Sequence, residues 1–181
     1  MKKIMLVFTF GVFLVACDSK KDKPATTETT NNVTTSTVEL PYKASFSSNF
    51  STDVSDADLK LVLMSYKDWA DGNMSNVSKE YGDTLVWERP DGAHFKLPNA
   101  GIMKLWGTYR DSLSSIALDM QAWQKMYAVD RKEAYIVTWY KETDTYKGGK
   151  ADSAYYHDIN QVKDGKIIQL EQYKRPVTVI K

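Results

Sequence analysis

The sequence predicts an α+β domain: three N-terminal helices packed on a strongly curved, mainly antiparallel sheet. Two observations carry this prediction. Apolar residues recur with helical spacing between residues 55 and 113, and β-branched and aromatic residues dominate the chain after that. Helices that precede a run of strands, instead of alternating with them, are typical of the α+β class. We expect this single domain to span residues 51–181.

The first helix is expected to begin after Ser55, which can cap it together with Asp58 three residues later. Apolar side chains that recur every three or four residues then form one stripe on this helix. The stripe consists of Leu59, Val62, Leu63, Tyr66, Trp69 and Ala70. Asp71-Gly72-Asn73 ends the helix, and a second, shorter helix is expected through Met74, Val77 and Tyr81.

A short strand is predicted next, from Thr84 to Arg89, because it stops at Pro90 before an Asp-Gly turn. Residues 90–98 are predicted to be a loop, and Asn99 is expected to cap the third helix. Four long antiparallel strands should follow, since turn signals such as Gly148-Gly149 and Asp164-Gly165 separate the remaining β-rich segments.

Residues 1–16 are predicted to be a lipoprotein signal peptide. Lys2 and Lys3 precede an apolar run of thirteen residues. This run is too short for a spanning helix, which needs about 20 residues. It ends in Leu14-Val15-Ala16-Cys17, which resembles the bacterial lipobox, so Cys17 is the expected lipidation site. The alternative is an incidental free thiol, because the chain has no other cysteine.

A covalent lipid, such as palmitate, on Cys17 would attach the protein to a membrane of the bacterial cell envelope, on its periplasmic or surface side. Residues 17–50 are expected to be a flexible tether, because residues 20–40 contain seven threonines and no aromatic residue. A packed strand within residues 41–50 is the alternative.

Charge and motifs exclude several classes of partner. Without residues 1–16 the chain keeps 22 basic and 23 acidic side chains, so no basic surface is expected to bind nucleic acid. The two histidines form no metal-binding pattern, and there is no phosphate-binding glycine loop or dinucleotide fingerprint. We therefore expect neither a metal nor another cofactor.

The element order, with "YKDWADGNMSNVSKEYGDTLVWERPDG" and "DINQVKDGKIIQLEQY", resembles the nuclear transport factor 2-like superfamily. The resemblance covers roughly residues 55 to 176 and is greatest to the SnoaL-like and ketosteroid-isomerase-like branch. It implies a cone-shaped half-barrel with a pocket between sheet and helices. Members include isomerases, cyclases, hydrolases and dehydratases, as well as pockets without known chemistry, and many dimerise through the outer face of the sheet.

The resemblance places the carboxylate base of the isomerase branch at Arg89. An arginine stays protonated and cannot accept a proton, and strand alternation points the adjacent Glu88 to the opposite face. The steroid-isomerase mechanism is therefore not expected. At the rim of the pocket, Arg89 would either hold an anionic group of a ligand or form an ion pair with Asp91 or Glu88.

Counting back from Gly165, the family's donor acid falls on His157, a candidate general acid or base that Asp119 would orient. The alternative for His157 is a half-buried strand histidine. Tyr66 lies close to the tyrosine donor of the isomerase branch, although counting without gaps from Gly72 reaches Ser65. The alternative for Tyr66 is a place in the core.

Nine residues are expected to line the pocket, although one sequence does not fix the register of its strands. They are Tyr66, Trp69, Trp87, Arg89, Trp106, Trp123, Trp139, Tyr155 and His157. Three functions follow. The first is a lipoprotein that binds a small apolar or amphipathic molecule. The second is an isomerase-, cyclase- or hydrolase-like enzyme using His157, and the third is a dimeric interaction module without ligand.

Overall fold

The computed structural model describes residues 39–177. The predicted signal peptide, the lipidation site Cys17 and most of the predicted tether lie outside these residues. All the helices and strands below belong to the unit that begins at Pro41. Within residues 39–177, no helix is both long enough and apolar enough to cross a bilayer.

Three helices form where helical spacing predicts them: α1 (Asp56–Asp71), α2 (Met74–Glu80) and α3 (Asn99–Asp111). The hydroxyl oxygen of Ser55 caps α1 by accepting a hydrogen bond from the Asp58 amide at 3.0 Å, as expected. Gly72 ends α1 at φ 77°, a backbone conformation that favours glycine. Asn73, predicted only as part of the stop, also caps α2.

A single sheet packs against these helices, and its seven strands follow the order β1-β4-β5-β6-β7-β2-β3. All neighbouring strands are antiparallel except the pair β2 and β7. The strands are β1 (Phe50–Ser51), β2 (Tyr81–Glu88), β3 (His94–Pro98), β4 (Leu113–Ala128), β5 (Glu133–Tyr146), β6 (Ala151–Lys163) and β7 (Lys166–Pro176).

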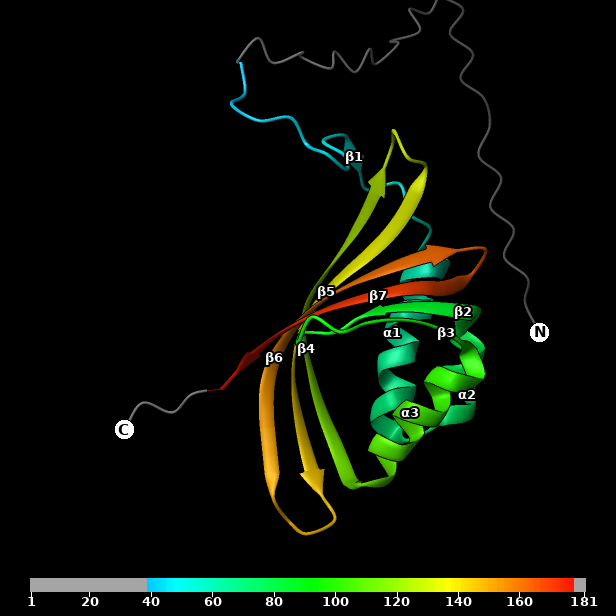
Figure 1. The fold of residues 1–181 in the computed structure, drawn as a ribbon, viewed down its shortest axis with the longest axis vertical. Coiled ribbons are helices and arrows are strands. Elements are labelled where there is room, and N and C mark those ends of the chain that lie inside the picture. Colours follow the sequence, from blue (N-terminus) through cyan, green and yellow to red (C-terminus); the bar gives the residue numbers. More distant parts are fainter. Residues whose placement is uncertain (1–38, 178–181) are drawn as a thin grey trace, which may run out of the picture. The chain divides into compact units, whose positions relative to one another are not determined.

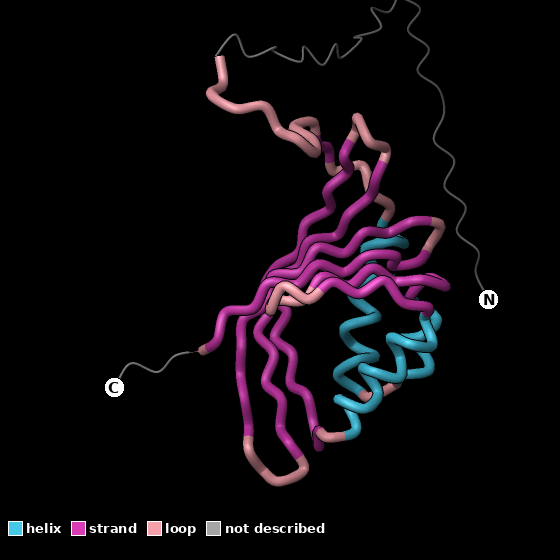
Figure 2. Tube along the Cα trace, viewed as in Figure 1, coloured by secondary structure: helices cyan, strands magenta, loops and turns pink. Residues whose placement is uncertain are grey.

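The sheet curls around the helices without closing into a barrel (Figures 1 and 2). Pairing shifts register in four places, including between Met120 and Ala122 in β4 and between Tyr81 and Val86 in β2. Such irregularities bend strands and increase their twist, which favours a concave face. The predicted α+β class, with three helices on a strongly curved and mainly antiparallel sheet, is confirmed.

Two local predictions between α2 and α3 are wrong. Residues 94–98, predicted to be loop, form β3, which pairs with β2 from Glu88↔His94 to Thr84↔Pro98. Asn99 does not cap α3; its amide group instead donates to the carbonyl oxygens of Ser78, Tyr81 and Gly82 at 2.9–3.2 Å. This side chain therefore fixes α3 to the junction of α2 and β2.

The packed region begins before residue 51, because Phe50 and Ser51 pair with Ala128 and Tyr127 at the edge of the sheet. The core itself lies between the helices and the concave face. Its fully buried apolar side chains come from both layers: Val62, Val77, Leu85, Ile102, Ile136 and Ile167. Apolar burial of this kind is the main favourable term holding helices on a sheet.

Candidate functional site

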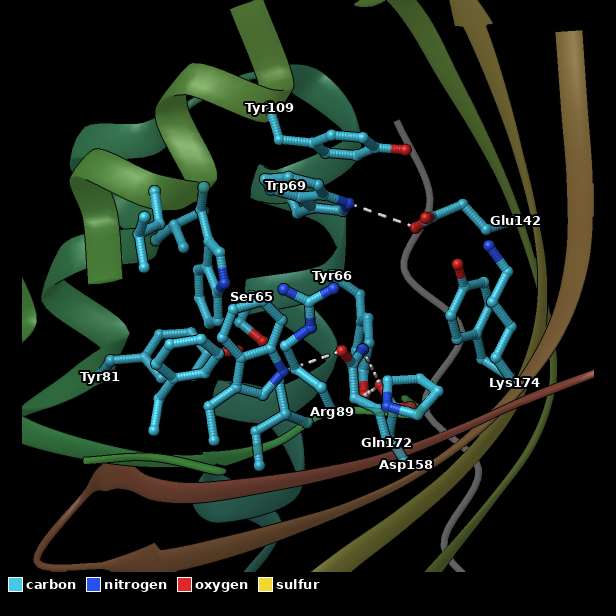
Figure 3. Close-up of a pocket in the computed structure, with 18 of the residues that line it drawn as sticks. Ser65, Tyr66, Trp69, Tyr81, Arg89, Tyr109, Glu142, Asp158, Gln172 and Lys174 are labelled. Atoms are coloured by element: carbon cyan, nitrogen blue, oxygen red, sulfur yellow. Dashed lines mark hydrogen bonds between the residues drawn. The ribbon is translucent and has the colours of Figure 1, made fainter. Parts of the chain in front are cut away.

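A cavity of about 500 Å³ opens between the helices and the concave face of the sheet (Figure 3). Its size is within the range of small-molecule sites. Nine of its twenty lining residues are aromatic: Tyr66, Trp69, Tyr81, Trp87, Phe95, Trp106, Tyr109, Tyr140 and Tyr156. Seven other lining residues have polar or charged side chains: Ser65, Arg89, Asp91, Glu142, Asp158, Gln172 and Lys174.

Asp158, on β6, is a fully buried carboxylic acid that lines this cavity. One of its oxygens, Oδ2, accepts hydrogen bonds from Tyr66 and Tyr140 at 2.9 Å each and from Gln172 at 3.2 Å. Its other oxygen, Oδ1, is buried without a partner among the described residues. Burial raises the pKa of Asp158 to about 6, although the three hydrogen bonds oppose the rise.

Tyr66 links Asp158 to two further buried polar residues. Its hydroxyl oxygen lies 2.9 Å from Thr138 Oγ1 and accepts a hydrogen bond from Asn160 Nδ2 at 3.1 Å. Because the Tyr66 proton goes to Asp158, Thr138 is the donor in its own pair. Burial and the nearby Asp158 carboxylate raise the pKa of Tyr66 well above 10, so its hydroxyl stays a donor.

Two more acids lie on the inner face of β5. Glu142 accepts a hydrogen bond from the Trp69 indole at 3.2 Å, and Asp144 accepts one from the Tyr109 hydroxyl at 2.6 Å. Burial, followed by repulsion from Asp144, raises the pKa of Glu142 to about 8. Burial also raises the pKa of Asp144. Glu142 thus favours its protonated form near neutral pH when nothing else is bound.

Arg89, Asp91 and Lys174 form the exposed rim of the cavity. Arg89 Nη2 lies 2.8 Å from Asp91 Oδ2, and the guanidinium lies 5.4 Å from the centre of the Trp87 ring. Lys174 Nζ lies 5.5 Å from the centre of the Tyr156 ring. The ion-pair alternative for Arg89 is therefore the arrangement observed, with Asp91 as the partner.

Trp106 organises the aromatic wall on the helical side. Its ring packs edge-on against Trp69, Tyr81 and Trp87, at centroid distances of 6.4, 5.1 and 5.5 Å. The indole of Trp87 donates to Gln172 Oε1 at 3.0 Å, so this wall is connected to the hydrogen bonds around Asp158. Edge-to-face rings of this kind form a preorganised surface for an apolar ligand.

Five of the nine residues expected in the pocket line the cavity: Tyr66, Trp69, Trp87, Arg89 and Trp106. Ser65, which counting from Gly72 reached, lines it as well. Tyr66 combines both of its alternatives, because it belongs to the core and also donates to Asp158. Glu88 lies outside this wall, where its Oε1 is 2.6 Å from His94 Nδ1.

The expected inward positions of His157, Trp139 and Tyr155 are wrong. These side chains lie on the opposite face of the sheet, because Asp158 and its alternate neighbours on β6 face the helices. His157 stacks on Trp139 at 4.8 Å and packs against Tyr173 at 5.8 Å. The half-buried alternative for His157 therefore describes its place, although its Nε2 has no partner among the described residues.

Trp123 and Asp119, both on β4, also lie away from the cavity. Trp123 is 51% exposed and lines a separate shallow groove between α1 and β4, together with Leu63 and Met120. Asp119 is exposed and pairs in register with Lys141. Asp119 is not among the hydrogen-bond partners of His157, so the proposed acid–histidine pair does not form among the described residues.

Sequence reasoning missed Asp158, Glu142 and Tyr140. The signal for Asp158 was present, since it is the neighbour of the residue reached by counting back from Gly165. Every second residue of β5 from Thr138 to Asp144 faces the helices, a set that includes Tyr140 and Glu142. Correct placement of any one of them would have located the others.

Comparison with known proteins gives likenesses in structure alone: no protein-family model matches the chain, and no curated protein matches it. An epoxide hydrolase-like protein of M. tuberculosis has a TM-score of 0.57 at 13% identity, covering 66% of this chain and 83% of its own. An NTF-2-like protein of unknown function from Burkholderia xenovorans has a TM-score of 0.52 at 15% identity, and the match covers 70% of this chain and 88% of that protein.

A third structure, TerC co-crystallised with polyporic acid, has a TM-score of 0.54 at 17% identity, covering 66% of this chain and 92% of its own. Identities this low show the fold but not the activity. The domain has the α+β cone fold of nuclear transport factor 2-like proteins.

Proposed function

We propose that this chain is a lipid-anchored protein of the bacterial cell envelope whose domain binds a small apolar or amphipathic molecule. The observation that carries the proposal is the cavity of about 500 Å³, which is lined by nine aromatic side chains and by the buried carboxyl group of Asp158. Such a combination of apolar wall and few buried polar groups is the usual composition of a ligand site.

The structural neighbours support a small-molecule ligand. One is an epoxide hydrolase-like protein, and another was co-crystallised with polyporic acid. Both are similar to this domain in fold. The steroid-isomerase reaction is not part of the proposal, because the resemblance places its base at Arg89, a permanent cation that pairs with Asp91.

Native mass spectrometry of the full chain, released from its membrane by a mild detergent, tests the binding function. We expect a bound small molecule on the wild type and its loss in Leu105→Trp, which adds bulk to a lining residue that is 46% exposed. Val129→Trp, at a 40% exposed position outside the cavity, is the matched control and should keep the molecule. Equal occupancy in both variants would contradict binding in this cavity.

The anchor has its own test. Cys17→Ala should move the protein from the membrane fraction to the soluble fraction and abolish incorporation of labelled fatty acid, because the acceptor thiol is gone. Ser19→Ala changes a neighbouring small residue and should have no effect. Membrane retention of the Cys17→Ala protein would contradict lipid anchoring at this residue.

Acid–base catalysis at Asp158 is a second candidate function. The observation that favours it is a buried carboxyl group with a pKa of about 6, held by the hydroxyls of Tyr66 and Tyr140 at the wall of the cavity. Incubating the co-purified molecule with fresh protein tests it: conversion by the wild type but not by Asp158→Asn supports catalysis. Recovery of unchanged molecule from both proteins contradicts it and leaves binding intact.

Self-association through the outer face of the sheet is a third candidate. The stack of Trp139, His157 and Tyr173 places aromatic surface there, with Tyr173 51% exposed. Sedimentation velocity should show a dimer that Tyr173→Glu dissociates, whereas Trp123→Glu, on another surface, leaves it intact. A monomeric wild type would exclude this candidate.

A further inference from the structure

We propose that the cavity selects a cationic amine carried on an apolar or aromatic body. The ammonium group would lie against an acidic wall, defined here as Glu142 and Asp158, and the body would lie among Trp69, Trp87 and Trp106. This inference rests on the proposed binding function and adds the charge and chemical class of the ligand.

The first argument is a cluster of buried carboxyl groups without a cationic partner. Glu142 and Asp158 line the cavity with exposures of 8% and 0%, and Asp144, beside Glu142 on β5, is 7% exposed. None of the five ion pairs formed by residues 39–177 includes these acids. Buried carboxylates are normally compensated by a cation, so this wall lacks its counterpart within the described part of the chain.

The second argument is a missing hydrogen-bond donor. Asp158 lines the cavity, and its fully buried Oδ1 accepts no hydrogen bond from any described residue, although the other oxygen accepts three. An oxygen left without a donor in an apolar surrounding is costly. A protonated amine carries both the missing donor and the missing charge, whereas an alcohol supplies the donor alone.

The two cations that line the cavity do not fill this role. Arg89 is engaged with Asp91 at 2.8 Å on the exposed rim. Lys174 is exposed and lies over the Tyr156 ring, and it forms no ion pair of 4 Å or less with the acidic wall. The figure labels both side chains together with Glu142 and Asp158 (Figure 3). Neither cation contacts the acidic wall, and Lys174 acts on Glu142 only at a distance, as a charge that opposes the rise of its pKa.

The third argument is the surrounding aromatic surface. Trp69 stacks on Tyr109 at 6.3 Å with an interplanar angle of 7°, and its indole N–H points to Glu142. Ring faces attract cations, and the attraction grows when the cation is shielded from water. A site that combines ring faces with a carboxylate distinguishes a cation from a neutral molecule of the same shape by two independent interactions.

Proton release is a consequence of this arrangement. Several titratable and charged groups influence Glu142 directly or through Asp144. They are Tyr140 and Asp144 on β5, Asp152, Tyr156 and Asp158 on β6, Lys174 on β7, and Tyr109 and Arg110 on α3. Burial and repulsion raise the pKa of Glu142 to about 8, so binding an ammonium at pH 7 expels a proton. The affinity for an amine should therefore rise with pH while the amine itself stays protonated.

The test compares two probes of nearly equal shape, 4-phenylbutylamine and 4-phenylbutan-1-ol, on the full chain in a nonionic detergent. Isothermal titration at pH 8 should give an affinity about tenfold or more higher for the amine. The affinity for the amine should fall by about tenfold between pH 8 and pH 6.5, and the affinity for the alcohol should not. Titrations into protein-free micelles correct for partitioning.

Glu142→Gln should remove most of the preference for the amine, because the amide keeps an oxygen acceptor for Trp69 but loses the charge. Glu171→Gln is the same substitution on β7, at a position on the face of the sheet away from the cavity, and should leave the preference unchanged. If the Glu142→Gln protein does not fold, the wild type alone tests the inference, through the ratio of its affinities for the amine and the alcohol and the pH dependence of that ratio.

Two outcomes overturn the inference and separate it from the proposed function. Equal or tighter binding of the alcohol at pH 8 would show a cavity that binds neutral molecules, so the binding function would stand and the amine preference would fall. Failure of both probes to bind would contradict the amine inference and also count against an apolar binding cavity.

Discussion

The Tyr66 hydroxyl donates a 2.9 Å hydrogen bond to Asp158 and so joins α1 to β6 across the core. Both groups are buried, and Thr138 and Asn160 complete the hydrogen bonds of the tyrosine from the sheet. This link fixes the first helix over the concave face at the inner end of the cavity. It also occupies one oxygen of Asp158, while the other is buried without a partner among the described residues.

Removing the Tyr66 hydroxyl should therefore destabilise the domain. Tyr66→Phe leaves Asp158, Thr138 and Asn160 each without one partner, and we expect the free energy of unfolding to fall by about 1–3 kcal/mol. Urea denaturation measures the change. Tyr173→Phe, which removes an exposed hydroxyl bonded only to Glu171, is the matched control and should cost little.

Stability should decrease as the pH rises from about 4 to 8. Glu80, Asp158 and Glu142 have folded-state pKa values raised to about 7, 6 and 8, mainly by burial. In the unfolded chain such acids lose their protons near pH 4. Between these pH values the folded state binds more protons, so the free energy of unfolding falls with pH. Urea midpoints across this range measure the slope.

Glu142→Gln should flatten the upper part of that dependence, between about pH 5 and 8, because the variant no longer titrates there. The same series of urea midpoints provides the measurement. Glu171→Gln, the same change on the outer face of the sheet, serves as the control. Identical slopes for wild type and Glu142→Gln would contradict the raised pKa.

The aromatic wall should be sensitive to Trp106. Trp106→Ala removes the ring that contacts Trp69, Tyr81 and Trp87, and we expect a loss of about 3 kcal/mol in the free energy of unfolding. Trp123→Ala removes a ring that is 51% exposed and should cost less than about 1 kcal/mol. Thermal and urea unfolding of the two variants compare the same Trp→Ala substitution at a packed and at an exposed position.

His157→Ala should leave ligand binding in the cavity unchanged, because its ring lies between Trp139 and Tyr173 on the other face of the sheet. Asp158→Asn, one residue along, should alter binding, since it changes the lining itself. Titration of whichever molecule co-purifies with the wild type measures both effects. An affinity lost in His157→Ala but kept in Asp158→Asn would reverse the assignment of faces.

Local patterns in the sequence determined the α+β class, the cap of α1 at Ser55 and the glycine at its end, because capping and backbone conformation depend on neighbouring residues. The same patterns failed at β3. This strand is stabilised by its pairing with β2. A segment of only five residues has too few positions to show the alternating pattern of a strand, so its sequence does not reveal the pairing. Asn99 likewise resembles a cap in sequence, yet it binds carbonyl groups from α2 and β2.

Which face of β6 meets the helices was decided by tertiary structure alone. Tyr156 and Asp158 face the cavity while Tyr155 and His157 face away, so each side of the strand carries an aromatic and a polar residue. Hydrophobic alternation then gives no preference, and an error of one residue exchanges the two faces. The sequence determined that a curved sheet would hold helices over an aromatic pocket; packing decided that Asp158, and not His157, lies inside it.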